Sequence, residues 1–195
     1  MESIYFVITW LCHRKCPHCY EDRFQPYYGE DLRRVVEESA ANVPRIIANL
    51  PERMTFRDLA DAGDTGEFLE KRGRIILAGG EVLLDPIREP VLYPAIRAIR
   101  ARYRDRGGVE IIIQTTGDIV RPHMVRELLA AGVDVITVSG MDDYHEGMDR
   151  EGAQQRLTEK LTRMFEAEGM EPSNGNPRTR EEGRRGGEEA EAARG

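Results

Sequence analysis

The sequence predicts an α/β fold in which about four parallel strands alternate with helices. Four short runs of apolar, largely β-branched residues each end at a cluster of cysteine, glycine or hydroxyl residues. A segment whose apolar residues recur at helical spacing follows each run. Strands that are apolar along their whole length are typical of parallel sheets covered by helices on at least one face.

The predicted elements come in strand and helix pairs. Residues 3–10 form the first strand, and residues 30–50 form a helix that Pro44 should kink or break. Residues 51–72 are mixed and polar, and we expect a connection that carries a short helix. The remaining strand and helix pairs are expected at 74–78 and 91–103, at 109–114 and 122–131, and at 133–138 and 151–168.

The end of the chain differs in composition from the rest. From residue 171 onward Gly, Arg, Glu, Pro, Asn and Ala dominate, and large apolar side chains are almost absent. Such a segment cannot bury enough surface to offset the entropy lost on ordering. We therefore expect a core domain over residues 1–170 and a disordered tail over residues 171–195.

Charge and hydropathy limit the classes of partner. The net charge is -7, and basic residues are interspersed with acidic ones, so binding to nucleic acid is unsupported. No apolar run approaches the ~20 residues that a membrane-spanning helix needs. The first ten residues lack the features of a signal peptide. We expect a cytoplasmic protein with no membrane partner.

Cys12, Cys16 and Cys19 follow the first strand directly, with three and then two residues between them. Cysteines this close together in a reducing compartment indicate metal or redox chemistry rather than disulfides. Three thiolates suit an iron-sulfur cluster, and they leave one iron of a four-iron cube without a protein ligand. The alternative is a structural zinc loop, although no second short pair of ligands accompanies the cysteines. The candidates for its fourth ligand are His13, His18 and His145.

Three further strand ends carry unusual residues: Gly79-Gly80-Glu81, Gln114-Thr115-Thr116-Gly117 and Ser139-Gly140. The carboxyl ends of parallel strands lie at one rim, where chemistry gathers in α/β architectures. The alternative for each segment is an ordinary turn or a helix cap. A polar cluster after the fourth strand is either a substrate site or a solvated loop; it consists of Asp142, Asp143, Tyr144 and His145.

With this cysteine spacing and these strand ends, residues 3–145 resemble the radical S-adenosylmethionine (radical SAM) superfamily. Its members carry three cysteines with the same spacing after the first strand of a β/α barrel, and Ala78-Gly79-Gly80-Glu81 is similar to their Gly-Gly-Glu segment. The resemblance implies a partial parallel (β/α) barrel of the TIM-like type. The family's usual core has six β/α units where this chain has about four, so the fourth strand should have an open edge unless a partner covers it.

The resemblance also implies a ligand set. Cys12, Cys16 and Cys19 would hold a 4Fe-4S cluster as thiolates, and S-adenosylmethionine would chelate the fourth iron. Glu81 would accept a hydrogen bond from the cofactor's ammonium, and glycines would let the backbone approach it. The full set of predicted cofactor-binding residues is Cys12, Cys16, Cys19, Gly79, Gly80, Glu81, Thr116 and Ser139.

The implied activity is that of a radical SAM enzyme, which cleaves S-adenosylmethionine reductively to a 5′-deoxyadenosyl radical for hydrogen abstraction. The substrate would be a peptide or small metabolite, and the electron donor a flavodoxin or ferredoxin. The residues do not identify a catalytic side chain beyond the cofactor ligands. The alternative is a non-catalytic remnant of such an enzyme that binds a metal or a partner.

Overall fold

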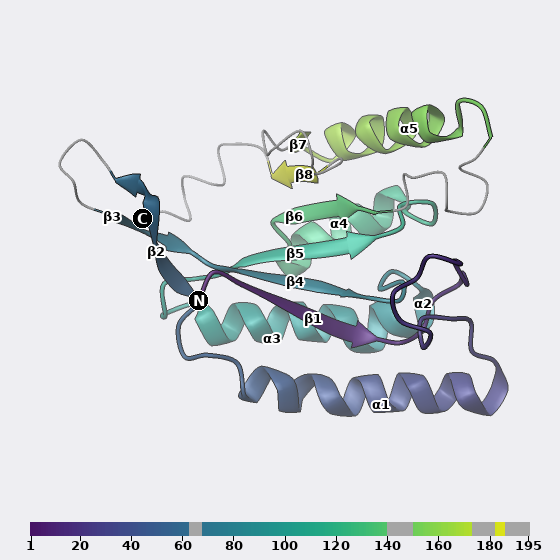
Figure 1. The fold of residues 1–195 in the computed structure, drawn as a ribbon, viewed down its shortest axis with the longest axis horizontal. Coiled ribbons are helices and arrows are strands. Elements are labelled where there is room, and N and C mark those ends of the chain that lie inside the picture. The colour runs from purple at the N-terminus through teal and green to yellow at the C-terminus, as the bar shows by residue number, and fades with distance from the viewer. Residues whose placement is uncertain (63–67, 140–149, 173–181, 186–195) are drawn as a thin grey trace.

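The computed structural model describes residues 1–62, 68–139, 150–172 and 182–185. Four parallel strands, each followed by a helix, form its centre (Figure 1). This confirms the predicted α/β fold. The strands, in their order in the sheet, are β1 (Ser3–Thr9), β4 (Arg74–Gly79), β5 (Glu110–Thr115) and β6 (Val135–Val138), and the helices are α1 (Gly29–Ala48), α3 (Tyr93–Tyr103), α4 (Pro122–Ala131) and α5 (Ala153–Ala167).

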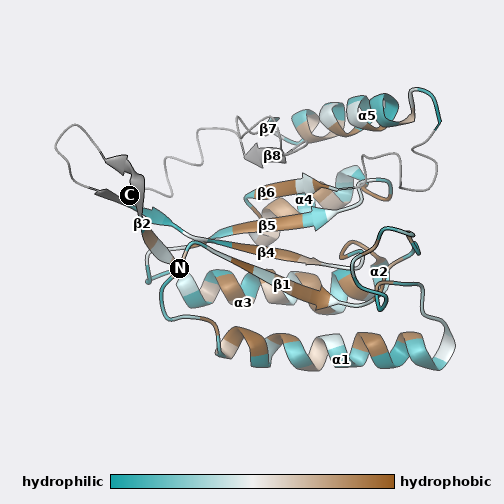
Figure 2. Ribbon diagram, in the orientation of Figure 1, coloured by the Kyte–Doolittle hydropathy of each residue, from teal (hydrophilic) through white to brown (hydrophobic). Residues whose placement is uncertain are grey.

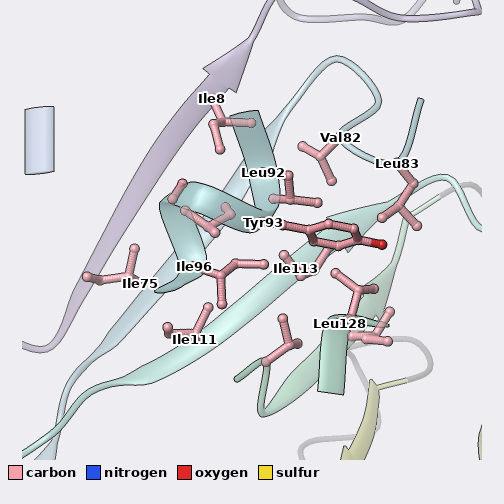
Figure 3. Close-up of a cluster of buried hydrophobic side chains, with 14 of the residues drawn as sticks. Ile8, Ile75, Val82, Leu83, Leu92, Tyr93, Ile96, Ile111, Ile113 and Leu128 are labelled. Carbon is pink, nitrogen blue, oxygen red and sulfur yellow. The ribbon is translucent and has the colours of Figure 1, made fainter. Parts of the chain in front are cut away.

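The hydrophobic core lies between the sheet and its helices. Figure 2 shows that the central strands are largely apolar, and Figure 3 shows Ile75, Ile111 and Ile113 packed among side chains from the helices. Because successive strand residues point to opposite faces, the residues between them line the other face of the sheet. On that face Tyr5 is 63% exposed, and its hydroxyl donates a hydrogen bond of 2.6 Å to Oε1 of Gln114. Ile112 and Val135 lie in register on the same face and are buried, so this face is open to solvent around Tyr5 but not along the whole sheet.

Helix α1 continues through Pro44, so the predicted break is absent. Proline cannot donate to the carbonyl four residues earlier, which here belongs to Ala40. Ala40 and Pro44 are both exposed, so that carbonyl lies on the solvated side of the helix, while Val43 and Ile47 on the other side are buried. The packing of the apolar side stabilises the helix despite one lost hydrogen bond. None of the described helices is long and apolar enough to cross a membrane.

The segment predicted to carry a short helix forms an antiparallel hairpin instead. Strand β2 (Thr55–Ala62) pairs with β3 (Phe68–Arg72), with Thr55 opposite Arg72. Thr55 and Phe56 are residue types that favour strands, and cross-strand pairing satisfies the backbone groups that a helix would pair locally. Gly63 and Gly66 lie outside the described residues.

The entry to α3 also differs from the prediction. The chain passes through a short helix α2 (Asp85–Ile87) and a π-helical turn η1 (Arg88–Leu92) before α3 begins. Pro90 and Pro94 have no N–H group to donate, and the N–H of Tyr93 donates to the carbonyl of Arg88, five residues earlier. The prolines thus set the irregular start of this helix.

Two short strands extend the sheet beyond β6. Strand β8 (Glu182–Arg185) pairs antiparallel with β6, and β7 (Met170–Pro172) pairs antiparallel with β8. The predicted open edge of β6 is therefore covered by this chain, and residues 171–172 and 182–185 are in strands where we expected disorder. Backbone pairing with an open edge needs no apolar side chains, which explains the difference. The remaining tail residues lie outside those described.

Candidate functional site

The carboxyl ends of the parallel strands bring the predicted segments together at one rim. The N–H of Gly80 donates to the carbonyl of Thr9 at 3.1 Å, and that of Glu81 donates to the carbonyl of Leu11 at 2.8 Å. These bonds join the end of β4 to the chain that leads into the cysteine loop. At the other side, the N–H of Ser139 donates to the carbonyl of Thr115 at 2.8 Å, joining β6 to β5.

The cysteine loop, residues 12–25, closes on itself at its base. The N–H of Cys12 donates to the carbonyl of Gln25 at 3.0 Å, and that of Cys19 donates to the carbonyl of Cys16 at 3.1 Å. The Cys12 side chain is buried, whereas Cys16 and Cys19 are half-buried, and none of the three forms a disulfide. The loop therefore carries three cysteine sulfurs, two of them open to solvent.

Aromatic side chains hold the second half of this loop against β1. The ring centroids of Trp10 and Phe24 are 5.4 Å apart, and Tyr20 meets Phe24 edge-on at 5.5 Å. The guanidinium of Arg23 lies 3.7 Å from the centroid of the Trp10 ring, within the range of a cation–π contact. These contacts fix residues 20–24, immediately after the third cysteine.

Gly79 and Gly80 are glycines because the backbone of the first strand passes close by. A Cβ at Gly80 would lie 2.0 Å from the carbonyl oxygen of Leu11 and 3.0 Å from the nitrogen of Cys12. A Cβ at Gly79 would lie 2.4 Å from the oxygen of Thr9, and its φ of +140° is one that side chains rarely adopt. The approach that requires these glycines is thus made by this chain itself. Their contact with a cofactor stays a prediction.

Glu81 is completely buried and bonded to the end of β5. Its Oε1 accepts from the N–H of Leu83 and the hydroxyl of Thr115, both at 2.9 Å, and its Oε2 accepts from the N–H of Thr116 at 2.8 Å. Burial raises the pKa of Glu81 above its ordinary value, and these hydrogen bonds only partly offset the effect. The side chain therefore ties β4 to β5. A hydrogen bond from a cofactor's ammonium to it stays a prediction.

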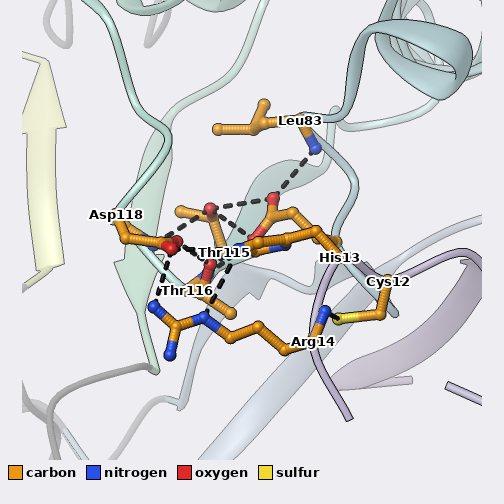
Figure 4. A network of polar contacts seen from close by, with 9 residues as sticks. Cys12, His13, Arg14, Leu83, Thr115, Thr116 and Asp118 are labelled. Atoms are coloured by element: carbon orange, nitrogen blue, oxygen red, sulfur yellow. Dashed lines mark hydrogen bonds and ion pairs between the residues drawn. The ribbon is translucent and has the colours of Figure 1, made fainter. Parts of the chain in front are cut away.

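Asp118 joins the cysteine loop to this network (Figure 4). Its Oδ2 lies 2.9 Å from Nε2 of His13 and accepts from Nη2 of Arg14 at 2.7 Å, while its Oδ1 lies 2.5 Å from Oγ1 of Thr116. Burial alone would raise the pKa of Asp118, but hydrogen bonds from His13, Thr116 and Arg14 lower it well below its usual range. The bond to Asp118, with the neighbouring Cys12 thiol, raises the pKa of His13 to about 10.

The Thr116 hydroxyl lies between two carboxyl groups. Its Oγ1 is 2.7 Å from Oε2 of Glu81 and 2.5 Å from Oδ1 of Asp118. One hydroxyl proton can serve only one of these contacts, so the second contact needs a proton from a carboxylic acid. Of the two carboxyl groups, Glu81 is the one whose pKa burial raises, whereas the pKa of Asp118 is lowered.

Sequence reasoning placed Thr116 and Ser139 at this rim, where the structure has them, but missed Asp118 and Arg14. Asp118 stands two residues beyond Thr116, so a search of the residues that follow each strand end would have found it. The hydroxyl of Ser139 contacts the carbonyl of Thr115 at 3.3 Å. Several predicted or considered residues lie outside the described ranges, namely Gly140, Asp142, Asp143, Tyr144 and His145.

The described side chains do not form a site for a single metal ion, but they fit a cluster. Within the described ranges, no three His, Cys, Asp or Glu side chains are arranged around a single metal ion. Thiolates that each bind a different iron of one cluster need not meet at one point. Nδ1 of His13 is buried and lacks a hydrogen-bond partner among the described residues, while its ring adjoins the Cys12 thiol. Three cysteines that form no disulfide, beside a buried ring nitrogen of His13, fit a group bound at this loop.

Comparisons with known proteins agree with these features. The family model described as the Radical SAM superfamily matches residues 6–168, which include the end of β1, the cysteine loop and the strands β4, β5 and β6. A search of curated proteins finds no match.

Proposed function

The chain belongs to the radical SAM superfamily, whose members are typically enzymes, and we propose that it binds a 4Fe-4S cluster and S-adenosylmethionine and cleaves the latter reductively. The observation that carries this proposal is the position of the cysteine loop. Its three cysteines, none of them in a disulfide, follow β1 closely, and backbone bonds join the residues just before the loop, Thr9 and Leu11, to Gly80 and Glu81. The two segments that identify the family are therefore in contact.

Cys12, Cys16 and Cys19 would hold three irons as thiolates. When bound, the cluster and its cofactor supply a 5′-deoxyadenosyl radical that abstracts hydrogen from a substrate. The chain's own residues position and shield this chemistry. The Gly79–Glu81 segment presents backbone at the rim, and Thr116 and Ser139 offer hydroxyls beside it.

We further propose a peptide or a small metabolite as substrate and a flavodoxin or ferredoxin as electron donor. The exposure of Tyr5 supports a substrate surface on this part of the sheet. Tyr5 is 63% exposed, and its hydroxyl donates a hydrogen bond to Oε1 of Gln114, so the two polar side chains lie side by side on one face.

A second candidate function is that of a non-catalytic remnant that binds a metal or partner. The exposure of Tyr5 favours it, because part of the sheet face that would have to shield a radical is open to solvent. Radical chemistry requires protection from water and side reactions. The two candidates agree on the cluster and differ in whether the cofactor is cleaved.

Anaerobic reconstitution with iron and sulfide separates the candidates. The proposed enzyme should bind about four irons per chain and release 5′-deoxyadenosine when reduced with dithionite in the presence of S-adenosylmethionine. Iron binding without release of 5′-deoxyadenosine would favour the remnant. Tight zinc binding without iron incorporation would contradict both.

Cys16→Ala is the sharpest variant for this experiment. The half-buried Cys16 contributes less to the core than Cys12, so its loss should leave the free energy of unfolding of the cluster-free protein nearly unchanged. It should abolish assembly of a complete cluster. A Cys16→Ala protein that still binds a full cluster would show that the ligands are misassigned.

A further inference from the structure

We propose that Asp118 is a positioning residue that fastens the cysteine loop to the end of β5. It makes the loop's only described ion pairs to the rest of the chain, through His13 and Arg14, which precede Asp118 by 105 and 104 residues. The purpose assigned to it, holding three thiols ready for a cluster, rests on the proposed function. The contact itself does not.

The geometry of the contact is that of a strong interaction. Oδ2 of Asp118 lies 2.7 Å from Nη2 of Arg14 and 2.9 Å from Nε2 of His13. The Arg14 side chain is 11% exposed, and those of Asp118 and His13 are 23% and 25% exposed. Charge-assisted hydrogen bonds that are shielded from water in this way are stronger than the ion pairs of an exposed surface.

The contact with Asp118 holds a different part of the cysteine loop from the aromatic contacts and the bond at its base. The stacked ring of Phe24 holds the second half of the loop, and the bond from Cys12 to Gln25 closes its base. Asp118 holds the first half at residues 13–14, between the first and second cysteines. With both halves held, Cys12 and Cys19 are fixed relative to the strands, and Cys16 is confined between two anchored segments.

Asp118 also connects the loop to Glu81. The Thr116 hydroxyl lies between the two carboxyl groups, at 2.5 Å from Asp118 and 2.7 Å from Glu81. A displacement of Asp118 would therefore disturb contacts both in the cysteine loop and in the segment that contains Glu81. Through Thr116, one side chain thus adds a second link between the two segments that the proposed function uses, besides the backbone bonds from Gly80 and Glu81.

The first test uses hydrogen exchange of the cluster-free full-length chain. In Asp118→Asn the side chain keeps its size and loses its charge, and exchange of the amides of residues 12–19 should quicken roughly tenfold or more. Asp134→Asn is the matched control. Asp134 also binds an arginine, Arg100, and the N–H of Ile111, but at the opposite end of the strands. It should leave exchange in the loop unchanged.

A double-mutant cycle distinguishes a specific contact between Arg14 and Asp118 from a general loosening of the cysteine loop. Arg14→Gln should quicken exchange in the loop as Asp118→Asn does, and the effect of the double variant should be smaller than the sum of the two single effects, because both single variants break the same ion pair. Both single variants should also incorporate iron more slowly than the wild type. Additive effects in the double variant, or unchanged exchange in Asp118→Asn, would overturn the proposal.

The outcomes separate this inference from the proposed function. If exchange quickens in Asp118→Asn as expected but the wild-type chain never takes up iron, the positioning role of Asp118 is supported and the proposed function is contradicted. If the wild type assembles a cluster and Asp118→Asn shows neither faster exchange nor slower iron uptake, the proposed function is supported and the positioning role of Asp118 is contradicted.

Discussion

The substitution Gly80→Ala tests how tightly the end of β4 is fitted to the cysteine loop. The added Cβ would lie 2.0 Å from the oxygen and 2.5 Å from the carbonyl carbon of Leu11. Ordinary van der Waals contact begins near 3.4 Å, so the oxygen contact alone requires a shift of 1.4 Å (3.4 minus 2.0). The contacted atoms belong to the backbone, so no change of rotamer can relieve the clash.

The free-energy cost of this shift has two parts, overpacking and the loss of a hydrogen bond. Overpacking typically costs about 1–3 kcal/mol, and loss of the 2.8 Å hydrogen bond from Glu81 to Leu11 adds about 1 kcal/mol. We expect Gly80→Ala to lower the free energy of unfolding by about 2–4 kcal/mol. Because Cys12 follows Leu11, the variant should also incorporate iron poorly when it is folded.

The assay is urea unfolding of the cluster-free protein, followed by reconstitution under conditions where the variant is folded. Gly29→Ala is the control, since the Gly29 φ of +54° strains any side chain but no atom lies within 4 Å of the added Cβ. It should cost about 1 kcal/mol and leave iron incorporation intact. A Gly80→Ala protein that is as stable as the wild type and binds iron fully would refute the reasoning.

Two further predictions concern the ion pair and the core. The pKa of His13 is raised from 6.5 to about 10 in the folded chain, so its stabilisation is complete below pH 6.5 and lost as the pH rises through 10. With a quarter of the side chain exposed, we expect wild type to lose about 1–3 kcal/mol more than His13→Gln between these pH values in urea unfolding. Leu128→Ala, in the fully buried core of α4, should lower the free energy of unfolding by about 2–5 kcal/mol and leave the iron content of the folded protein unchanged. An equal pH dependence in both His13 proteins, or loss of iron in folded Leu128→Ala, would contradict these expectations.

The parallel sheet and its helices could be predicted because their patterns are local. Helix α4 occupies residues 122–131 as predicted, since Pro122 and Gly132 mark its ends, and Gly132 adopts a φ of +111°. The hairpin at 55–72 could not be predicted in this way. Its strands mix polar and apolar residues, and they are stabilised by cross-strand pairs such as Thr55 with Arg72 rather than by a periodic apolar face.

In the candidate site, too, local sequence patterns could be predicted and contacts between distant residues could not. Cysteine spacing and the glycines at the end of β4 are visible along the chain, so Cys12 and Gly80 could be named in advance. The role of Asp118 could not, because the residues that it joins are more than a hundred positions apart. An acidic residue after a strand looks like a turn residue until the fold places Arg14 beside it.

The residues that identify the family also maintain the fold, which limits what their mutation can reveal. Gly80 fits against Leu11 and Glu81 ties β4 to β5, so loss of activity in variants of either would not demonstrate contact with a cofactor. Ser139 is a cleaner probe, because its half-buried hydroxyl makes only a 3.3 Å contact with the carbonyl of Thr115 among the bonds described. Ser139→Ala should therefore leave the free energy of unfolding within about 1 kcal/mol of the wild type. Weaker binding of S-adenosylmethionine to such a stable variant would then report a direct contact at this rim.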